Sequence, residues 1–179
     1  DQKLFGYSVS LDDSGEKMVV LDNKNNAYIY TRSGLGKFTL AGTAAGVGSV
    51  SSPSPPPNVS MSPNGDRFAV GCGTYNNDAG SITVWDINWN SNGTTVGSVS
   101  LVGENLNSAS LPVSIDPTTT DEITGRGLLG IGQFGFDSTG NVIVAGEYGL
   151  DSWGMWQYSD TKWIKLAANS SVETAIKNN

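Results

Sequence analysis

Side chains that could do acid–base chemistry are sparse in this sequence. The chain has no histidine, which excludes Ser-His-Asp and Cys-His nucleophile systems and histidine-ligated zinc. A pair of carboxylates could hydrolyse a glycosidic bond, and the candidates are Asp121, Glu122, Glu147 and Asp151. Nothing in their spacing fixes two of them at catalytic separation. We therefore expect no catalytic residues and a protein that is not an enzyme.

Metal ligands are also few. Cys72 is the single cysteine, so no disulfide can form within the chain and no cysteine cluster can hold a metal. We expect Cys72 to be a small buried hydrophobe rather than a reactive thiol. Asp22, Asp78 and Asp151 lie in polar loops that could offer oxygen ligands to calcium. Calcium takes six to eight oxygens, and each loop has too few carboxylates, so we expect no cofactor.

Aromatic side chains are the best candidates for binding a ligand or a partner. Trp89, Trp153 and Tyr148 lie near predicted strand ends and loops, and aromatic rings give a large rigid contact area at low entropic cost. Trp89 is the best candidate for exposure because residues 88–93 are otherwise polar. The other tryptophans with strand positions are expected to pack between sheets: Trp85, Trp156 and Trp163.

Three N-glycosylation sequons occur, beginning at Asn58, Asn92 and Asn169. Asn58 begins a predicted strand, whereas Asn92 lies in a polar loop. Asn92 is therefore the best acceptor if the protein is secreted.

Composition narrows the class of protein. The 179 residues carry 10 Lys+Arg against 17 Asp+Glu, a net charge of −7, which argues against nucleic acid or an anionic membrane as partner. No apolar run approaches the roughly 18 residues of a membrane-spanning helix. Glycine is abundant (23 residues) and only 15% of residues are charged. This composition indicates one turn-rich β domain over residues 1–179.

A repeated pattern supplies the elements that position these side chains. A short alternating strand, a four-residue turn ending in glycine and a more continuously apolar strand occur three times. The turns are 12–15, 62–65 and 137–140, and the apolar strands are 17–21, 67–71 and 142–146. We expect a positive φ at each turn glycine. Third strands are predicted at 27–31, 81–86 and 154–158, and fourth strands at 37–40, 97–101 and 162–166.

The segments between these strands define the organisation of the chain. The repeat units cover about 4–42, 58–103 and 132–167. A Pro/Ser-rich connector at 47–57, an inserted loop at about 104–128 and a tail at 168–179 complete the chain. Units of three to four antiparallel strands are typical of a β-propeller.

The repeats resemble known propeller families. Residues 5–11 and 27–34 are similar to the FG-GAP repeats of integrin-alpha-type propellers, and residues 62–65 with 84–86 resemble a WD40 blade. The calcium-binding Asp-x-Asp-x-Asp-Gly loop and the Gly-Ala-Pro signature of FG-GAP repeats are missing. The resemblance implies antiparallel β-propeller-like blades; a β-sandwich of the same strands is the structural alternative.

Three blades are fewer than the four to eight that close a propeller. We therefore expect a longer protein, an assembly of copies, or a partner that covers the open faces. The expected function is a non-catalytic structural or recognition module that contacts other protein chains as a homo- or hetero-oligomer. An extracellular, virion or cell-surface location is expected from the families that the repeats resemble. A carbohydrate-binding propeller, with glycans as partners, is the alternative, followed by a glycosidase.

Overall fold

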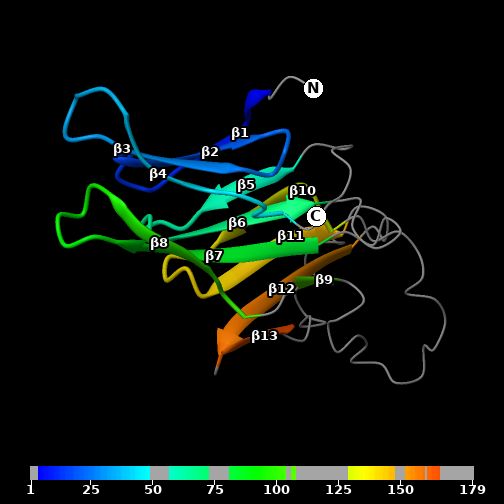
Figure 1. The fold of residues 1–179 in the computed structure, drawn as a ribbon. Coiled ribbons are helices and arrows are strands. Elements are labelled where there is room, and N and C mark those ends of the chain that lie inside the picture. The colour runs from blue at the N-terminus through cyan, green and yellow to red at the C-terminus, as the bar shows by residue number, and fades with distance from the viewer. Residues whose placement is uncertain are drawn as a thin grey trace, which may run out of the picture.

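The computed structural model describes residues 4–48, 57–72, 81–103, 106–107, 129–147, 152–159 and 161–165. All regular elements in these ranges are β-strands, and they form three antiparallel sheets that Figure 1 shows as successive layers. Sheet 1 contains β1 (Phe5–Leu11), β2 (Lys17–Asp22), β3 (Ala27–Thr31) and β4 (Thr39–Ala44) in chain order.

The other two sheets repeat this order. Sheet 2 contains β5 (Asn58–Met61), β6 (Arg67–Cys72), β7 (Ser81–Trp89) and β8 (Val96–Leu101). A fifth strand, β9 (Leu106–Asn107), pairs with β7. Sheet 3 contains β10 (Leu129–Phe136), β11 (Val142–Glu147), β12 (Ser152–Ser159) and β13 (Lys162–Lys165).

The turn between the first two strands has the same construction in every sheet. The turn glycines Gly15, Gly65 and Gly140 have φ values of 67°, 67° and 71°, which residues with a Cβ adopt at a cost. Each glycine N–H donates to the carbonyl of the first turn residue, at 3.1, 2.9 and 3.1 Å. The expectation of positive φ at these glycines is confirmed, and the turns fix the register of all three hairpins.

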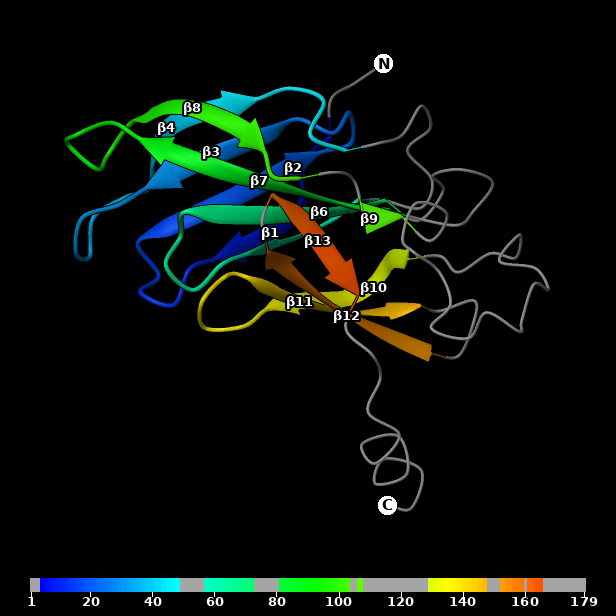
Figure 2. The same cartoon turned by 90° about the horizontal axis from the view of Figure 1, so that it is seen from below.

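The first strands of the three sheets lie next to one another. β5 contacts both β1 and β10. The hydroxyl oxygens of Ser8 and Ser10 on β1 accept hydrogen bonds from the backbone N–H groups of Val59 and Met61 on β5, at 3.1 and 2.9 Å. The later strands of each sheet lie progressively farther from this line of first strands, as Figure 2 shows for β3 and β4.

Two hydrophobic layers hold the sheets together. Between sheets 1 and 2 lie fully buried residues that include Val19, Ile29, Phe68 and Val70. Between sheets 2 and 3 lie Ile82, Val84, Ile143 and Trp156, all at most 1% exposed, with Trp163 at 6%. Alternate residues of β6 point into the two layers, because successive side chains of a strand face opposite sides. Sheet 2 is therefore covered on both faces.

The ends of the outer strands are also fixed by tryptophans. Trp85 donates from Nε1 to the carbonyl of Val47 (2.9 Å), and Trp163 donates to the carbonyl of Val102 (3.1 Å). The expectation that Trp85, Trp156 and Trp163 pack between sheets is confirmed, since all three lie in or against the two core layers. Cys72, 2% exposed, lies in the layer between sheets 1 and 2.

The all-β antiparallel class is confirmed, with one strand misplaced. The fourth strand of sheet 1 was predicted at 37–40 but is Thr39–Ala44. A turn in which the N–H of Gly36 donates to the carbonyl of Ser33 (3.1 Å) delays its start. The sheets do not close into a ring. β9 falls within the predicted inserted loop at 104–128, whose other residues, like most of the 47–57 connector and the 168–179 tail, lie outside the described residues.

Candidate binding site at the turn end of the sheets

A polar network follows from the construction of the turns. The side chain of the first turn residue accepts a hydrogen bond from the backbone N–H five residues later. This bond joins Asp12 to Lys17, Ser62 to Arg67 and Asp137 to Val142, at 3.0 Å in each case. It places the residue two positions after each turn glycine at the start of a central strand.

Lys17 uses this position to join sheet 1 to sheet 2. Its Nζ lies 2.8 Å from Oδ1 of Asp66 and donates to the carbonyl of Asn64 at 3.1 Å. The ammonium also lies 4.7 Å from the ring centroid of Trp89, within cation–π range. One cation therefore orders both a carboxylate and an indole of the neighbouring sheet.

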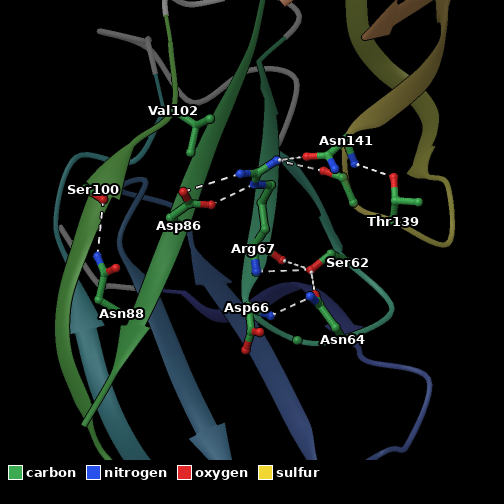
Figure 3. Close-up of polar contacts among 12 residues, drawn as sticks. Ser62, Asn64, Asp66, Arg67, Asp86, Asn88, Ser100, Val102, Thr139 and Asn141 are labelled. Atoms are coloured by element: carbon green, nitrogen blue, oxygen red, sulfur yellow. Dashed lines mark hydrogen bonds and ion pairs between the residues drawn. The ribbon is translucent and has the colours of Figure 1, made fainter. Parts of the chain in front are cut away.

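Arg67 does the same between sheets 2 and 3 (Figure 3). Its Nε and Nη2 face the two carboxylate oxygens of Asp86 at 2.6 and 3.3 Å. Nη1 donates across to the carbonyl of Gly140 (2.8 Å) and to Oδ1 of Asn141 (3.1 Å). The guanidinium carbon lies 5.3 Å from the ring centroid of Tyr158. Arg67 is well shielded, with 15% of its side chain exposed, so this fork fixes Asp86 in one orientation.

An open cavity of about 420 Å³, closer to a surface depression than to an enclosed pocket, lies beside these contacts. It is lined by Asp66, Asp86, Ile87, Asn88 and Trp89. The indole N–H of Trp89 donates to the carbonyl of Gly65 (3.2 Å), which holds its ring in place. Asp66 keeps 52% of its side chain exposed despite its pairing with Lys17, so the carboxylate is accessible to a ligand.

The chemistry of this cavity suits a neutral polyhydroxylated ligand. Carboxylate oxygens accept hydrogen bonds from hydroxyl groups, the Asn88 carboxamide both donates and accepts, and an aromatic side chain gives apolar area. A phosphate placed here would meet two carboxylates whose cationic partners are already engaged. An accessible carboxylate can also accept a proton from water.

Trp89, which the sequence indicated as the best candidate for exposure, lines this cavity but is half-buried against the layer between sheets 1 and 2. Our prediction missed Lys17, Asp66, Arg67 and Asp86. The available signal was the repeated position two residues after the turn glycine, which carries Lys17 and Arg67 in the first two units. Trp153 lies on β12 opposite Gly146, and its side chain lies outside the described part of the structure. Tyr148 also lies outside the described residues.

Of the three calcium candidates, Asp22 lies among the described residues. Asp22 is fully buried, while Asp78 and Asp151 lie outside the described residues. The carboxylate of Asp22 accepts bonds from the N–H groups of Lys24 (2.8 Å) and Asn26 (2.9 Å), the Asn26 side chain (2.8 Å) and the Tyr28 hydroxyl (3.1 Å). Its oxygens thus order the β2–β3 loop. Within the described ranges no group of three or more His, Cys, Asp or Glu side chains could hold a metal.

These hydrogen bonds shift the acidity of Asp22. Burial alone raises the pKa of Asp22, but the bonds from Asn26, Lys24 and Tyr28 outweigh burial and lower the pKa below its ordinary value of 3.8. In the third turn, burial likewise raises the pKa of Asp137. The bonds from Thr139, Val142 and Asn141 outweigh it, and the pKa falls below the ordinary value.

The remaining predicted residues fall in different environments. Asn92 is exposed in the β7–β8 turn, where its side-chain oxygen accepts from the N–H groups of Thr94 (3.0 Å) and Thr95 (3.2 Å). Asn58 is half-buried on β5 opposite Gly71. Asn169 and the carboxylates of Asp121, Glu122 and Asp151 lie outside the described residues. Glu147 ends β11, and its side chain is not described.

Comparison with known proteins gives a structural match. Neither a model of a protein family nor a curated protein sequence matches this chain. A solved structure that does match is a protein assigned as a 6-phosphogluconolactonase from Bacteroides fragilis, at a TM-score of 0.53 and 11% sequence identity. The match covers 88% of this chain and 36% of that one. At this identity the similarity shows the fold alone, a propeller-like arrangement of sheets, and this chain spans about a third of the matched protein.

This match corrects our expectation about function. We expected a non-catalytic structural module and no enzyme, because catalytic residue types are sparse. The matched structure is that of a protein assigned as an enzyme, so the expectation of a non-catalytic protein is wrong. The resemblance to FG-GAP repeats, the protein partners and the surface location remain predictions. The described residues include no helix long and apolar enough to cross a membrane.

Proposed function

We propose that this chain supplies three consecutive blades of a β-propeller hydrolase that opens a sugar lactone. The observation that carries the proposal is the fold match to the protein assigned as a 6-phosphogluconolactonase. Because that match spans about a third of the matched chain, further blades would complete the ring. One fold hosts many activities, so the activity rests on the cavity chemistry and on direct assay.

The arrangement of strands supports the propeller. In a propeller each blade is a four-stranded antiparallel meander around a central channel. Here the first strand of sheet 2 lies beside the first strands of both neighbours, and each sheet runs outward in chain order. The two core layers lie between successive sheets, as they would between adjacent blades.

The cavity supports a sugar as the ligand. Asp66, Asp86 and Asn88 offer acceptors for ring hydroxyl groups, and Trp89 supplies an aromatic wall. We assign this cavity to the hydroxylated part of the substrate, because two carboxylates disfavour an anionic group there. If the substrate is phosphorylated, its phosphate would lie outside this cavity.

Asp66 is the residue that would carry the chemical step. A water oxygen bonds to the lactone carbonyl carbon while one water proton passes to the Asp66 carboxylate. The ring C–O bond then breaks, and the proton passes to the departing ring oxygen to give the open-chain hydroxy acid. The Lys17 ammonium, 2.8 Å from Asp66, orients this carboxylate.

Proton release tests this proposal. Hydrolysis of gluconolactone and of its 6-phosphate by the purified chain would be followed in a pH-stat, against the spontaneous rate in buffer. We expect Asp66→Asn to lower the enzymatic rate by about 10² or more, as for loss of a general base. Asp13→Asn makes the same chemical change in the exposed first turn and should retain the rate. No acceleration above buffer, or an equal loss in both variants, would contradict the proposal.

A further inference from the structure

The inter-sheet contacts follow a directional rule. The residue two positions after a turn glycine faces the next sheet and contacts the residue that follows that sheet's turn glycine. Lys17 contacts Asp66 in this way, and Arg67 contacts Asn141.

The first turn offers acceptors for such a contact. No sheet among the described residues lies on that side to supply the cation. Glu16 follows Gly15 and is the positional equivalent of Asp66 and Asn141. This equivalence is structural, because the carbonyls of Glu16, Asp66 and Asn141 accept the same cross-strand bond from Arg32, Ile87 and Tyr158, each at 2.8 Å. Glu16 is exposed. Among the described residues the ion pairs are Lys17–Asp66 and Arg67–Asp86, and neither includes Glu16.

The first turn resembles the second turn in a further respect. The carbonyl of Gly15 accepts from Nε of Arg32 (2.6 Å), a residue of the same sheet, just as the carbonyl of Gly65 accepts from Trp89. In the second turn an incoming lysine therefore uses the preceding carbonyl and the following carboxylate. Ser14 and Glu16 hold these two positions in the first turn. Asp13 adds a second exposed carboxylate, so the turn is complementary to a cation.

The face of sheet 1 that points away from sheet 2 is apolar. Phe5, Val9 and Leu11 on β1 are 56%, 51% and 50% exposed, and Leu40 on β4 is 50% exposed. The Phe5 ring packs edge-on against Tyr28, with centroids 5.1 Å apart. Several large apolar side chains exposed on one face normally mark a surface that packs against a partner. Sheet 2 carries apolar residues on both of its faces, and there they are buried against sheets 1 and 3.

We propose that a further four-stranded sheet of the same repeat covers this face of sheet 1. Its residue two positions after the turn glycine is a lysine or arginine that pairs with Glu16. Sheet 3 of a second, unmodified copy does not meet this requirement, because Val142 holds that position. The occupant is therefore a sheet with a cation there. This inference rests on the propeller arrangement in the proposed function and not on its lactone chemistry.

A designed second copy supplies the required sheet and tests the proposal. Val142→Lys gives sheet 3 the missing cation, so that it can dock on sheet 1 of another molecule. We expect sedimentation equilibrium to show a self-dissociation constant about tenfold lower than that of the unmodified chain. Asn92→Lys adds the same charge at the exposed β7–β8 turn and should leave association unchanged. Adding Glu16→Lys to Val142→Lys should abolish the gain.

A reversed pair separates docking from loss of folding. Val142→Glu combined with Glu16→Lys should restore tight association, whereas Val142→Glu alone should not. Circular dichroism melts confirm that each variant is folded. Equal association of Val142→Lys and Asn92→Lys, or a gain insensitive to Glu16→Lys, would overturn the proposal. These readouts require no catalysis, so a failed lactone assay and a failed docking test are distinguishable.

Discussion

Nη1 of Arg67 donates to the carbonyl of Gly140 at 2.8 Å across 73 residues of sequence. This bond ties a central strand of sheet 2 to the turn of sheet 3, while the same guanidinium holds Asp86. Arg67 is therefore a direct polar link between the two sheets, together with the bond from Trp163 to the carbonyl of Val102.

Replacement of Arg67 should loosen that interface. Arg67→Met removes the bonds to Gly140 and Asn141 and leaves Asp86 without its cation. Asp86 keeps 39% of its side chain exposed, so water compensates in part, and we expect a loss of about 1–2 kcal/mol in the free energy of unfolding. Urea denaturation measures it. Arg32→Met, which removes a bond within one sheet, should cost less; an equal cost would contradict the linking role.

Gly65 should tolerate a side chain less well than another glycine of similar backbone. A Cβ at Gly65 would lie 2.3 Å from Cδ of Lys17, whereas a Cβ at Gly34 would meet nothing within 4 Å. Their φ values are 67° and 57°, so alanine strains both backbones by about 1–2 kcal/mol. Gly65→Ala should cost more because it also displaces Lys17 from Asp66. Thermal melts that show equal losses would argue that the Lys17 contact contributes nothing.

Gly154 should be required by the ring of Trp156. A Cβ at Gly154 would lie 2.1 Å from Cη2 of Trp156, and Trp156 is fully buried. Gly154→Ala should therefore destabilise the chain by about 1–3 kcal/mol, whereas Gly135→Ala, with open space around its Cβ, should cost less. In a Trp156→Leu background the penalty of Gly154→Ala should shrink. A double-mutant cycle in urea measures this coupling, and strict additivity would exclude the steric explanation.

Acid should weaken the fold through Asp22. The unfolded chain protonates this carboxyl near its ordinary pKa of 3.8, whereas the folded chain protonates it only at lower pH. Its stabilisation is thus complete above the unfolded pKa and is lost as the pH falls through the lowered folded pKa. We expect the free energy of unfolding to decrease between about pH 5 and pH 2. Asp22→Asn should weaken that dependence, with Asp137 contributing to what remains, whereas Asp13→Asn, at an exposed site, should preserve it.

Local sequence signals located the strands and turns because the responsible interactions are local. The turn glycines and alternating residues placed β3 at 27–31 and the hairpins correctly. The prediction of β4 was wrong because Gly42 and Ala44 give this segment little alternation of apolar and polar residues. Its position depends on contact with sheet 2, where a Cβ on Gly42 would lie 2.6 Å from Val96.

The candidate site was harder to predict for the same reason. Lys17 meets Asp66 across 49 residues, and no pattern within one repeat indicates which turn a cation will reach. Trp89 was identified from its polar surroundings, but its partners became apparent only when the sheets were placed side by side. Lys17 and Arg67 occupy the same position after the turn glycine, and this repeat was visible in the sequence. It predicts a contact partner only when the order in which the sheets pack is known.

The buried thiol of Cys72 allows the rate at which the first two sheets separate to be measured. The thiol is 2% exposed, and Sγ lies 2.8 Å from where a Cβ on Gly48 would stand. A thiol reagent can react only after this layer opens, so at high reagent concentration the labelling rate reports the opening rate itself. Since Cys72 is the single cysteine of the chain, the signal reports this one interface and not the layer between sheets 2 and 3.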